Sequence, residues 1–239
     1  MSEMKEYSTR YIQNQKKVEL WYTLPSTIKE MSLKPKPGEV LTVLSAVTSQ
    51  CAKSRRHRFT VSDFYIGKYE VTQAQWRAVM GTTVRQQRDK AGTDWPLAGE
   101  GDNYPMYYVS WDEAQEFIRR LNAQTGKQYR LPTEAEWEFA ARGGNNSRGY
   151  KYSGGNSEGN IAWYSENSNN ATHPVGTKSS NELGIYDMSG NVLEWCNDWY
   201  GDYNSNAQTN PQCPSSGFYR ILEQILVFNI KRIIFATLY

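Results

Sequence analysis

RLPTEAEWEFAARGG, from Arg130 to Gly144, is the stretch that decides the fold of this chain. Thr133 stands three residues before Glu136, and a threonine followed at that distance by a glutamate is the capping-box pattern that begins a helix. Trp137 and the alanines one turn later fall on one face, and the two glycines at the end of the stretch stop the helix. We therefore predict a short helix that packs inward through Trp137.

The same stretch holds three glutamates, Glu134, Glu136 and Glu138, which allow two interpretations. Carboxylates at close range serve as acid and base in many enzymes. Glu136 is already explained by the cap, however, and acidic residues in a first helical turn are stabilised by the positive end of the helix dipole. The pattern therefore favours a structural role for all three.

Two further helices are predicted by the same kind of start signal. Thr72 and Gln75 form a capping box, and Gly81 ends the helix that follows them. Ser110 and Glu113 form another, and apolar residues then recur at helical spacing over about three turns.

The segments around these helices are less regular. FTVSDFYIGKYEVT (59–72) alternates apolar and polar residues about a Gly-Lys pair, which predicts a hairpin. Residues 82–104 are polar and glycine-rich without a period, and we predict a long surface loop. Turn formers dominate after Gly144. Helices followed by short strands and long loops indicate an α+β domain.

Composition limits the class of protein. The chain has 239 residues, enough for one domain with its own core, and its 8 Trp and 17 Tyr suit a soluble, loop-rich fold filled by large rings. The formal net charge is +2, so no overall field attracts nucleic acid or an anionic membrane. The basic run CAKSRRHR (51–58) lacks interleaved aromatics and indicates a solvated loop. We expect no nucleic-acid partner.

Neither end of the chain carries a recognisable membrane signal. The first residues lack the apolar core of a secretory signal, which leaves the compartment open. The stretch ILEQILVFNIKRIIFATLY (221–239) is apolar, but charged and amide side chains interrupt it, whereas a spanning helix needs roughly 18 uninterrupted apolar residues. We predict no membrane span.

Transition-metal sites find little support in the sequence. The cysteines at 51, 196 and 213 are odd in number and show no CxxC spacing. His57 and His173 lie far apart without a second ligand at metal-binding distance along the chain. No zinc or iron site is predicted from these residues.

YDMSGNVLEW (186–195) offers the oxygen chemistry that calcium prefers. Asp187 supplies a carboxylate, the turn at Gly190 can direct a backbone carbonyl inward, and Val192 and Glu194 share one face of the following strand. Leu193 and Trp195 would then face the core. The alternative from pattern alone is a plain turn into a half-buried strand, with Glu194 solvated or paired to an arginine.

Four stretches, taken in order, carry a family resemblance. They are DFYIGKYEVTQAQWRAVMG (63–81), YPMYYVSWDEAQEFIRRLNAQTGKQYRLPTEAEWEFAARGG (104–144), NIAWYSENSNNATHPVG (160–176) and NELGIYDMSGNVLEWCNDWY (181–200). Together they resemble the formylglycine-generating enzyme, or sulfatase-modifying factor, family over about residues 57–221. The resemblance implies a C-type-lectin-like α+β fold with little regular secondary structure and with calcium held by loops.

The resemblance also implies sites and a reaction. Active members use copper and oxygen to oxidise a sulfatase cysteine to formylglycine, while other relatives bind ligands without known catalysis. Carried over by position, a first calcium site falls on Asp187, the carbonyls of Gly190 and Val192, and Glu194, and a second site begins at Asn160 and Ile161. Calcium is therefore expected as a structural ion.

The catalytic end of the family pattern is missing. Neither a GGSW-like motif nor an NxGFR-like ending is present, Cys196 and Cys213 lie outside the catalytic positions, and Leu193 replaces a pocket tryptophan. Copper is not expected here, and we predict an inactive member of the family. The alternatives are a binding module that presents the 82–104 and 145–180 loops to a protein or glycan, and a domain with another catalysis. A sulfatase-like protein is a further candidate partner.

The family pattern divides the chain into three segments. Residues 1–56 match poorly and lack a GGTFxMG-like strand, 57–221 form the family domain, and 222–239 are an aberrant tail. One hypothesis accounts for both ends: frameshifts or truncation of the gene leave residues up to about 56 and from about 223 out of frame. Translation of the other frames of the DNA would contradict it if no family-like peptide appears at either break point.

Overall fold

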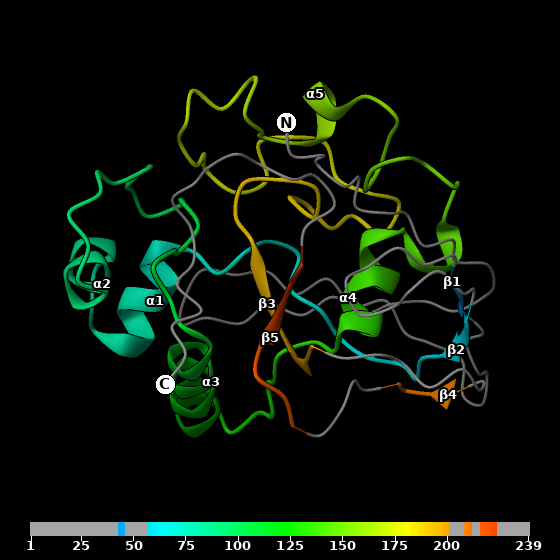
Figure 1. The fold of residues 1–239 in the computed structure, drawn as a ribbon, viewed down its shortest axis with the longest axis horizontal. Coiled ribbons are helices and arrows are strands. Elements are labelled where there is room, and N and C mark those ends of the chain that lie inside the picture. Colours follow the sequence, from blue (N-terminus) through cyan, green and yellow to red (C-terminus); the bar gives the residue numbers. More distant parts are fainter. Residues whose placement is uncertain (1–42, 46–56, 201–207, 212–215, 224–239) are drawn as a thin grey trace.

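The computed structural model describes residues 43–45, 57–200, 208–211 and 216–223 (Figure 1). Its helices are α1 (Gln73–Met80), α2 (Val84–Lys90), α3 (Trp111–Thr125), α4 (Glu134–Ala141), the 3-10 turn η1 (Gly144–Asn146) and α5 (Glu158–Ile161). Its strands are β1 (Val43–Ser45), β2 (His57–Thr60), β3 (Glu194–Trp199), β4 (Gln208–Thr209) and β5 (Arg220–Glu223). The mixture of helices, short strands and long loops confirms an α+β domain.

The three predicted helices begin where their capping boxes place them. At Thr72, Ser110 and Thr133 the side chain accepts a hydrogen bond from the backbone N–H three residues later. The side chain at that later position accepts in turn from the backbone N–H of the capping residue. Gly81 and Gly126 end α1 and α3 in the left-handed conformation that glycine adopts without strain. These start and stop signals depend only on residues that are close in sequence, and the sequence alone therefore predicts them.

Two of the less regular segments differ from their predictions. Residues 82–104 are not wholly a loop, because α2 begins after Thr83 with a fourth capping box, formed by Thr83 and Gln86. The predicted hairpin at 59–72 is wrong as well. Strand β2 pairs with β1 and β4 instead, and Thr72 forms an isolated bridge with Pro105.

The two small sheets lie apart, as Figure 1 shows. One has the order β1-β2-β4, and in the other β3 pairs antiparallel with β5. The β3–β5 pair occupies the middle of the view, with α1, α2 and α3 on one side and α4 on the other (Figure 1). Helix α4 contacts both of its strands.

The core is divided between these two sides. Trp137 and Phe139 of α4 centre one cluster, which also contains Cys196 from β3. Trp76 of α1 stacks on Phe117 of α3 in the other, with ring centroids 5.3 Å apart. Strand β3 therefore has packed neighbours on both faces.

The facing of β3 is the reverse of the prediction. Cys196 and Asp198 are 0% and 4% exposed and point toward the α4 side. Leu193 and Trp195 are only partly buried and line a pocket on the opposite side. Alternation along the strand is present, but the even-numbered residues are the more deeply buried set.

Several predictions fall on residues outside the described ranges. Most of the N-terminal segment 1–56 and of the tail 222–239 is among them, as are Cys51 and Cys213. Among the helices that the structure describes, none has the length and apolar character required to cross a membrane.

Candidate metal centre and adjoining pocket

The predicted calcium turn has an unusual backbone. Asp187 and Asn191 have φ angles of 61° and 64°, and Gly190 has 159°. Asp and Asn adopt the left-handed region more readily than most residues, because their short polar side chains bond locally. A Cβ at Gly190 would come within 2.5 Å of the Trp163 carbonyl oxygen, so this position requires glycine.

In the structure Asp187 and Glu194 point inward, and each accepts a hydrogen bond from an uncharged donor. The Gly176 N–H donates to Asp187 Oδ2 at 2.7 Å, and the Trp137 indole N–H donates to Glu194 Oε2 at 3.2 Å. Burial raises the pKa of Asp187 to about 6 and that of Glu194 to about 7. Glu194 is partly buried at the start of its strand, and among the described residues it forms no ion pair with an arginine.

A third carboxylate, Glu70, was missed by the sequence analysis. It is 7% exposed, and burial, Asp187 and Glu194 all raise its pKa well above its usual value. Its sequence signal was the one that drew attention to Glu194, an acidic residue between apolar neighbours in YEV. Glu70 lies more than a hundred residues earlier in the chain, so no local pattern could connect it to the turn.

These three side chains suit a hard cation. Several buried carboxylates close enough to raise one another's pKa are unfavourable unless a positive charge offsets them. Within the described ranges none of the three makes an ion pair, and no set of three or more His, Cys, Asp or Glu side chains is close enough to hold an ion unaided. An ion at this turn would therefore need backbone oxygens as well, which is the mixed ligand set that calcium takes.

The second predicted site has less support in the structure. Asn160 and Ile161 end helix α5, where Asn160 is exposed and Ile161 is buried with Tyr152 and Ala162. The Asn160 carbonyl already accepts from the Ser179 N–H at 3.0 Å. The next two residues, Ala162 and Trp163, lie against Gly190 of the first turn, and the role of Asn160 and Ile161 as ligands stays a prediction.

A pocket of about 420 Å³ adjoins the predicted calcium turn (residues 186–192, called the metal turn below). It lies on the face of the following chain that carries Leu193 and Trp195. Its apolar wall includes Tyr107, Tyr108, Leu193 and Trp195, and the Lys90–Glu113 ion pair, 2.6 Å long, lies on its lining.

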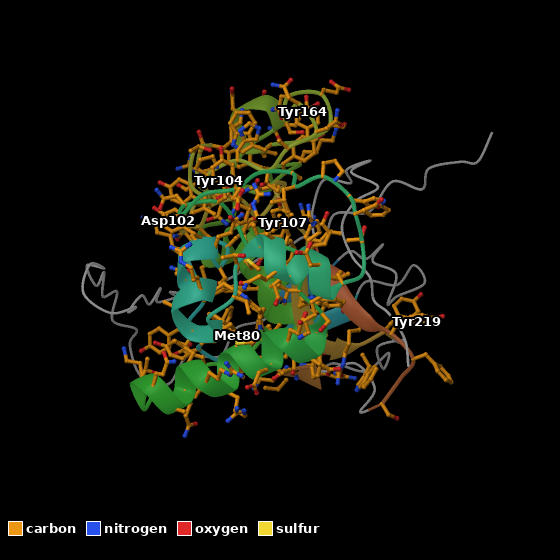
Figure 2. All side chains as sticks on the ribbon, turned by 90° about the vertical axis from the view of Figure 1, so that its left-hand side faces the viewer. Met80, Asp102, Tyr104, Tyr107, Tyr164 and Tyr219 are labelled. Atoms are coloured by element: carbon orange, nitrogen blue, oxygen red, sulfur yellow. The ribbon has the colours of Figure 1, made fainter. Side chains whose placement is uncertain are left out.

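The pocket wall is fixed by hydrogen bonds. The Tyr107 hydroxyl accepts from the Ala98 N–H and donates to the Gly99 carbonyl, while burial raises its pKa to about 12. Tyr107 lies between helices α1 and α2 and the loop that carries Tyr164 (Figure 2). Tyr108 has a φ of 60°, a costly conformation for a bulky residue and one that is enriched at functional sites.

Cys196 is the one cysteine whose side chain the structure describes. It is 0% exposed in the core beside α4, and burial raises the pKa of its thiol well above the usual value. Because the thiolate is the form that binds metal, this thiol is poorly suited to copper.

Comparison with known proteins places the chain in a family. A model of the sulfatase-modifying factor enzyme 1-like domain matches residues 26–223, a wider span than the four stretches that carried the resemblance. The chaperone protein LppX of Paenibacillus barcinonensis is 38% identical over 194 residues, covering 59% of this chain and 64% of that protein. The formylglycine-generating enzyme of Streptomyces coelicolor is 37% identical over 135 residues, covering 50% and 41%.

Solved structures agree with this placement. Treponema denticola variable protein 1 superposes with a TM-score of 0.61 at 30% identity, covering 79% of this chain and 84% of that one. PvdO from Pseudomonas aeruginosa, at a TM-score of 0.59 and 24% identity, shares the fold. The alignments span less than two thirds of the length of the two curated relatives named above. The chain belongs to the sulfatase-modifying factor enzyme 1-like family, which includes formylglycine-generating enzymes.

Proposed function

We propose that this chain is a calcium-bound member of its family, with a C-type-lectin-like arrangement, that does not carry out copper-dependent oxidation of cysteine. The observation that carries the calcium part is the set of three carboxylates, Glu70, Asp187 and Glu194, gathered in the interior on neutral donors. The family supplies the class of ion, and the turn supplies oxygens of the kind that such an ion binds.

In this proposal Asp187 and Glu194 hold the ion together with the carbonyls of Gly190 and Val192. When bound, the ion supplies positive charge that offsets the buried carboxylates and fixes the turn. The protein's part is to hold the turn in its strained backbone and to keep Glu194 oriented through the Trp137 indole N–H. The role is structural, and Asn160 and Ile161 are retained as the proposed start of a second calcium site.

Calorimetric titration of the chelator-treated full chain with calcium tests this proposal. We expect saturable binding that Glu194→Gln weakens by an order of magnitude or more, since a charged ligand is lost. Glu136→Gln is the matched control, because that glutamate is also removed from solvent but has Arg130 as its partner. A chain that takes up no calcium would overturn the proposal.

Cys196 is the one described thiol that bears on the copper part of this proposal. Copper(I) selects soft sulfur ligands, and Cys196 is buried with a raised pKa. Oxygen consumption by the copper-treated chain with a peptide that carries the sulfatase cysteine motif is the direct measurement. We expect the rate of the buffer with copper alone, and sustained turnover that produces formylglycine would contradict the proposal.

A second candidate function is favoured by the pocket beside Leu193 and Trp195. An apolar cavity of about 420 Å³ with aromatic walls and an ion pair on its lining has the character of a ligand site. Under this candidate the chain is a non-catalytic module that binds a protein or glycan.

Filling the pocket tests the binding candidate. Leu193→Trp would occupy the cavity from one wall, whereas Glu136→Gln leaves it unchanged. We expect ligands captured from a glycan array or a displayed peptide library to bind the wild type and Glu136→Gln but not Leu193→Trp. Ligands that bind all three variants equally, or a search that finds none, would count against it.

A further inference from the structure

We propose that Glu70 is a positioning residue for the calcium ion: it holds the backbone of the metal turn from a distant segment and adds a third negative charge beside the ion. This inference rests on the calcium proposal above. Glu70 lies three residues before helix α1, and its contacts reach 121 and 122 residues along the chain.

Both oxygens of Glu70 are bound to the turn. Oε1 accepts from the Val192 N–H at 3.0 Å, and Oε2 accepts from Asn191 Nδ2 at 2.7 Å. Val192 is one of the residues whose carbonyl is proposed to face the ion. A carboxylate on the N–H of that residue therefore fixes the peptide plane next to the ligand carbonyl.

Asn191 extends this support to two neighbouring loops. Its Nδ2 also donates to the His173 carbonyl, and its Oδ1 accepts from the His173 N–H at 2.9 Å. Its own backbone N–H donates to the Trp163 carbonyl at 3.0 Å. Glu70 thus anchors a residue that ties the turn to the 160–180 segment, and its removal would loosen more than one contact.

Positioning accounts for Glu70 better than direct coordination does. Each of its oxygens already accepts a hydrogen bond, and among the residues that the structure describes no three acidic side chains converge closely enough to bind an ion by themselves. The charge of Glu70 is nevertheless near Asp187 and Glu194. A cation at the turn would be attracted by all three while touching two.

The test is calcium affinity in Glu70→Gln, a nearly isosteric change that removes the charge. Residues that support metal ligands typically change affinity by about 10–100-fold when mutated, and we expect the Kd to rise within that range. Calorimetry on the chelator-treated full chain gives the value. Glu136→Gln, which removes the charge of a carboxylate on α4, should keep the wild-type Kd.

A second variant covers the case in which Glu70→Gln does not fold. Asn191→Gly removes the amide that Glu70 binds, and glycine accepts the backbone angle of 64° without strain. If Glu70 acts partly through Asn191, Asn191→Gly alone weakens calcium binding. Where Glu70→Gln also folds, the double change costs less than the product of the two single effects. The non-additive result is one that a general loss of stability would not produce.

The outcomes separate this inference from the proposal on which it rests. Calcium binding by the wild type with an unchanged Kd in Glu70→Gln or in Asn191→Gly overturns the role of Glu70 and leaves the calcium proposal standing. Failure of the wild type to bind calcium overturns both. A weakened Kd in both variants, with Glu136→Gln unaffected, supports the inference.

Discussion

The glutamates of helix α4 and the carboxylates around the proposed calcium turn differ in what surrounds their charge. Glu134, Glu136 and Glu138 are 2%, 7% and 8% exposed. Arg130 pairs with Glu136 through both terminal guanidinium nitrogens, at 2.7 and 2.6 Å, and Arg142 pairs with Glu138. These charges are buried, but arginines are in contact with two of them.

The turn carboxylates have only neutral donors among the described residues. Their hydrogen bonds come from Val192, Asn191, Gly176 and the Trp137 indole. The charge of a buried carboxylate is offset when a guanidinium lies beside it, whereas several carboxylates that have only neutral donors repel one another. Burial alone therefore does not distinguish a candidate metal site, whereas a missing counter-charge does.

Trp137 is where the two regions meet, and changing it should have the largest effect. The side chain is 1% exposed on α4, and its indole N–H binds Glu194. Trp137→Ala should lower the free energy of unfolding by about 3–5 kcal/mol, as large-to-small changes of core aromatics do. Urea unfolding followed by circular dichroism measures the loss.

Trp137→Phe is the matched control for this prediction. It keeps an aromatic ring in the core, removes the donor to Glu194 and leaves a smaller cavity than alanine does, so its cost in stability should be smaller than that of Trp137→Ala, while calcium binding should also weaken. A loss below about 1 kcal/mol in Trp137→Ala would show that α4 and the turn are not joined through this side chain.

Calcium should stabilise the protein through the turn and not through α4. An ion at about 100 times its Kd stabilises the native state by about 2.7 kcal/mol, and for a domain of this size each kcal/mol raises Tm by roughly 2–4 °C. For the wild type and for Glu136→Gln alike, the Tm measured with calcium should therefore be higher than the Tm measured with chelator. Equal melts in both conditions would remove the distinction between the two regions.

The pH dependence of the chelator-treated protein should carry the sign of raised carboxyl pKa values. Asp187 at about 6 and Glu194 at about 7 lie above their values of 3.8 and 4.5 in the unfolded chain. Between the unfolded and folded pKa values, the folded state binds more protons than the unfolded state does. The stability that these two groups contribute is therefore greatest below about pH 4 and falls as the pH rises through 7. At about 1.4 kcal/mol per pKa unit, the two shifts together correspond to a loss of about 6 kcal/mol.

Urea unfolding in chelator at several pH values checks this prediction. Saturating calcium should flatten the decline, because the bound ion compensates the ionised carboxylates. Asp187→Asn should reduce the decline in chelator, whereas Glu138→Gln, whose glutamate has Arg142 beside it, should leave it as it is. Stability that rises with pH in chelator would contradict the assigned pKa shifts.

How much of this site was predictable follows from the range of each interaction. The helix starts at Thr72, Ser110 and Thr133 were found because a capping box closes within four residues. The role of Glu70 was not, because its partners lie 121 and 122 residues away. No short-range pattern could bring that residue to the turn.

The errors in the strands have the same origin. A strand was predicted from Val192, but β3 begins at Glu194. Both faces of β3 have packed neighbours, and periodicity does not reveal which face is more deeply buried. The predicted hairpin at 59–72 failed because β2 pairs with segments at 43–45 and 208–209. Asp187 and Glu194 were chosen by the family resemblance, and spacing alone had left a plain turn as the alternative.

The smallest effect is expected where a charge pair reaches the surface. Arg130 is 59% exposed at its side chain, while its partner Glu136 is 9% exposed. Partly exposed ion pairs contribute about 1 kcal/mol or less, and salt screens them. Arg130→Met should therefore lower stability by no more than about 1 kcal/mol at low salt and by less at high salt, because Glu136 keeps its capping bond from the Thr133 N–H. Unfolding at two salt concentrations checks this, and a much larger, salt-independent loss would mean that the α4 glutamates depend on their arginines as strongly as the turn carboxylates are expected to depend on calcium.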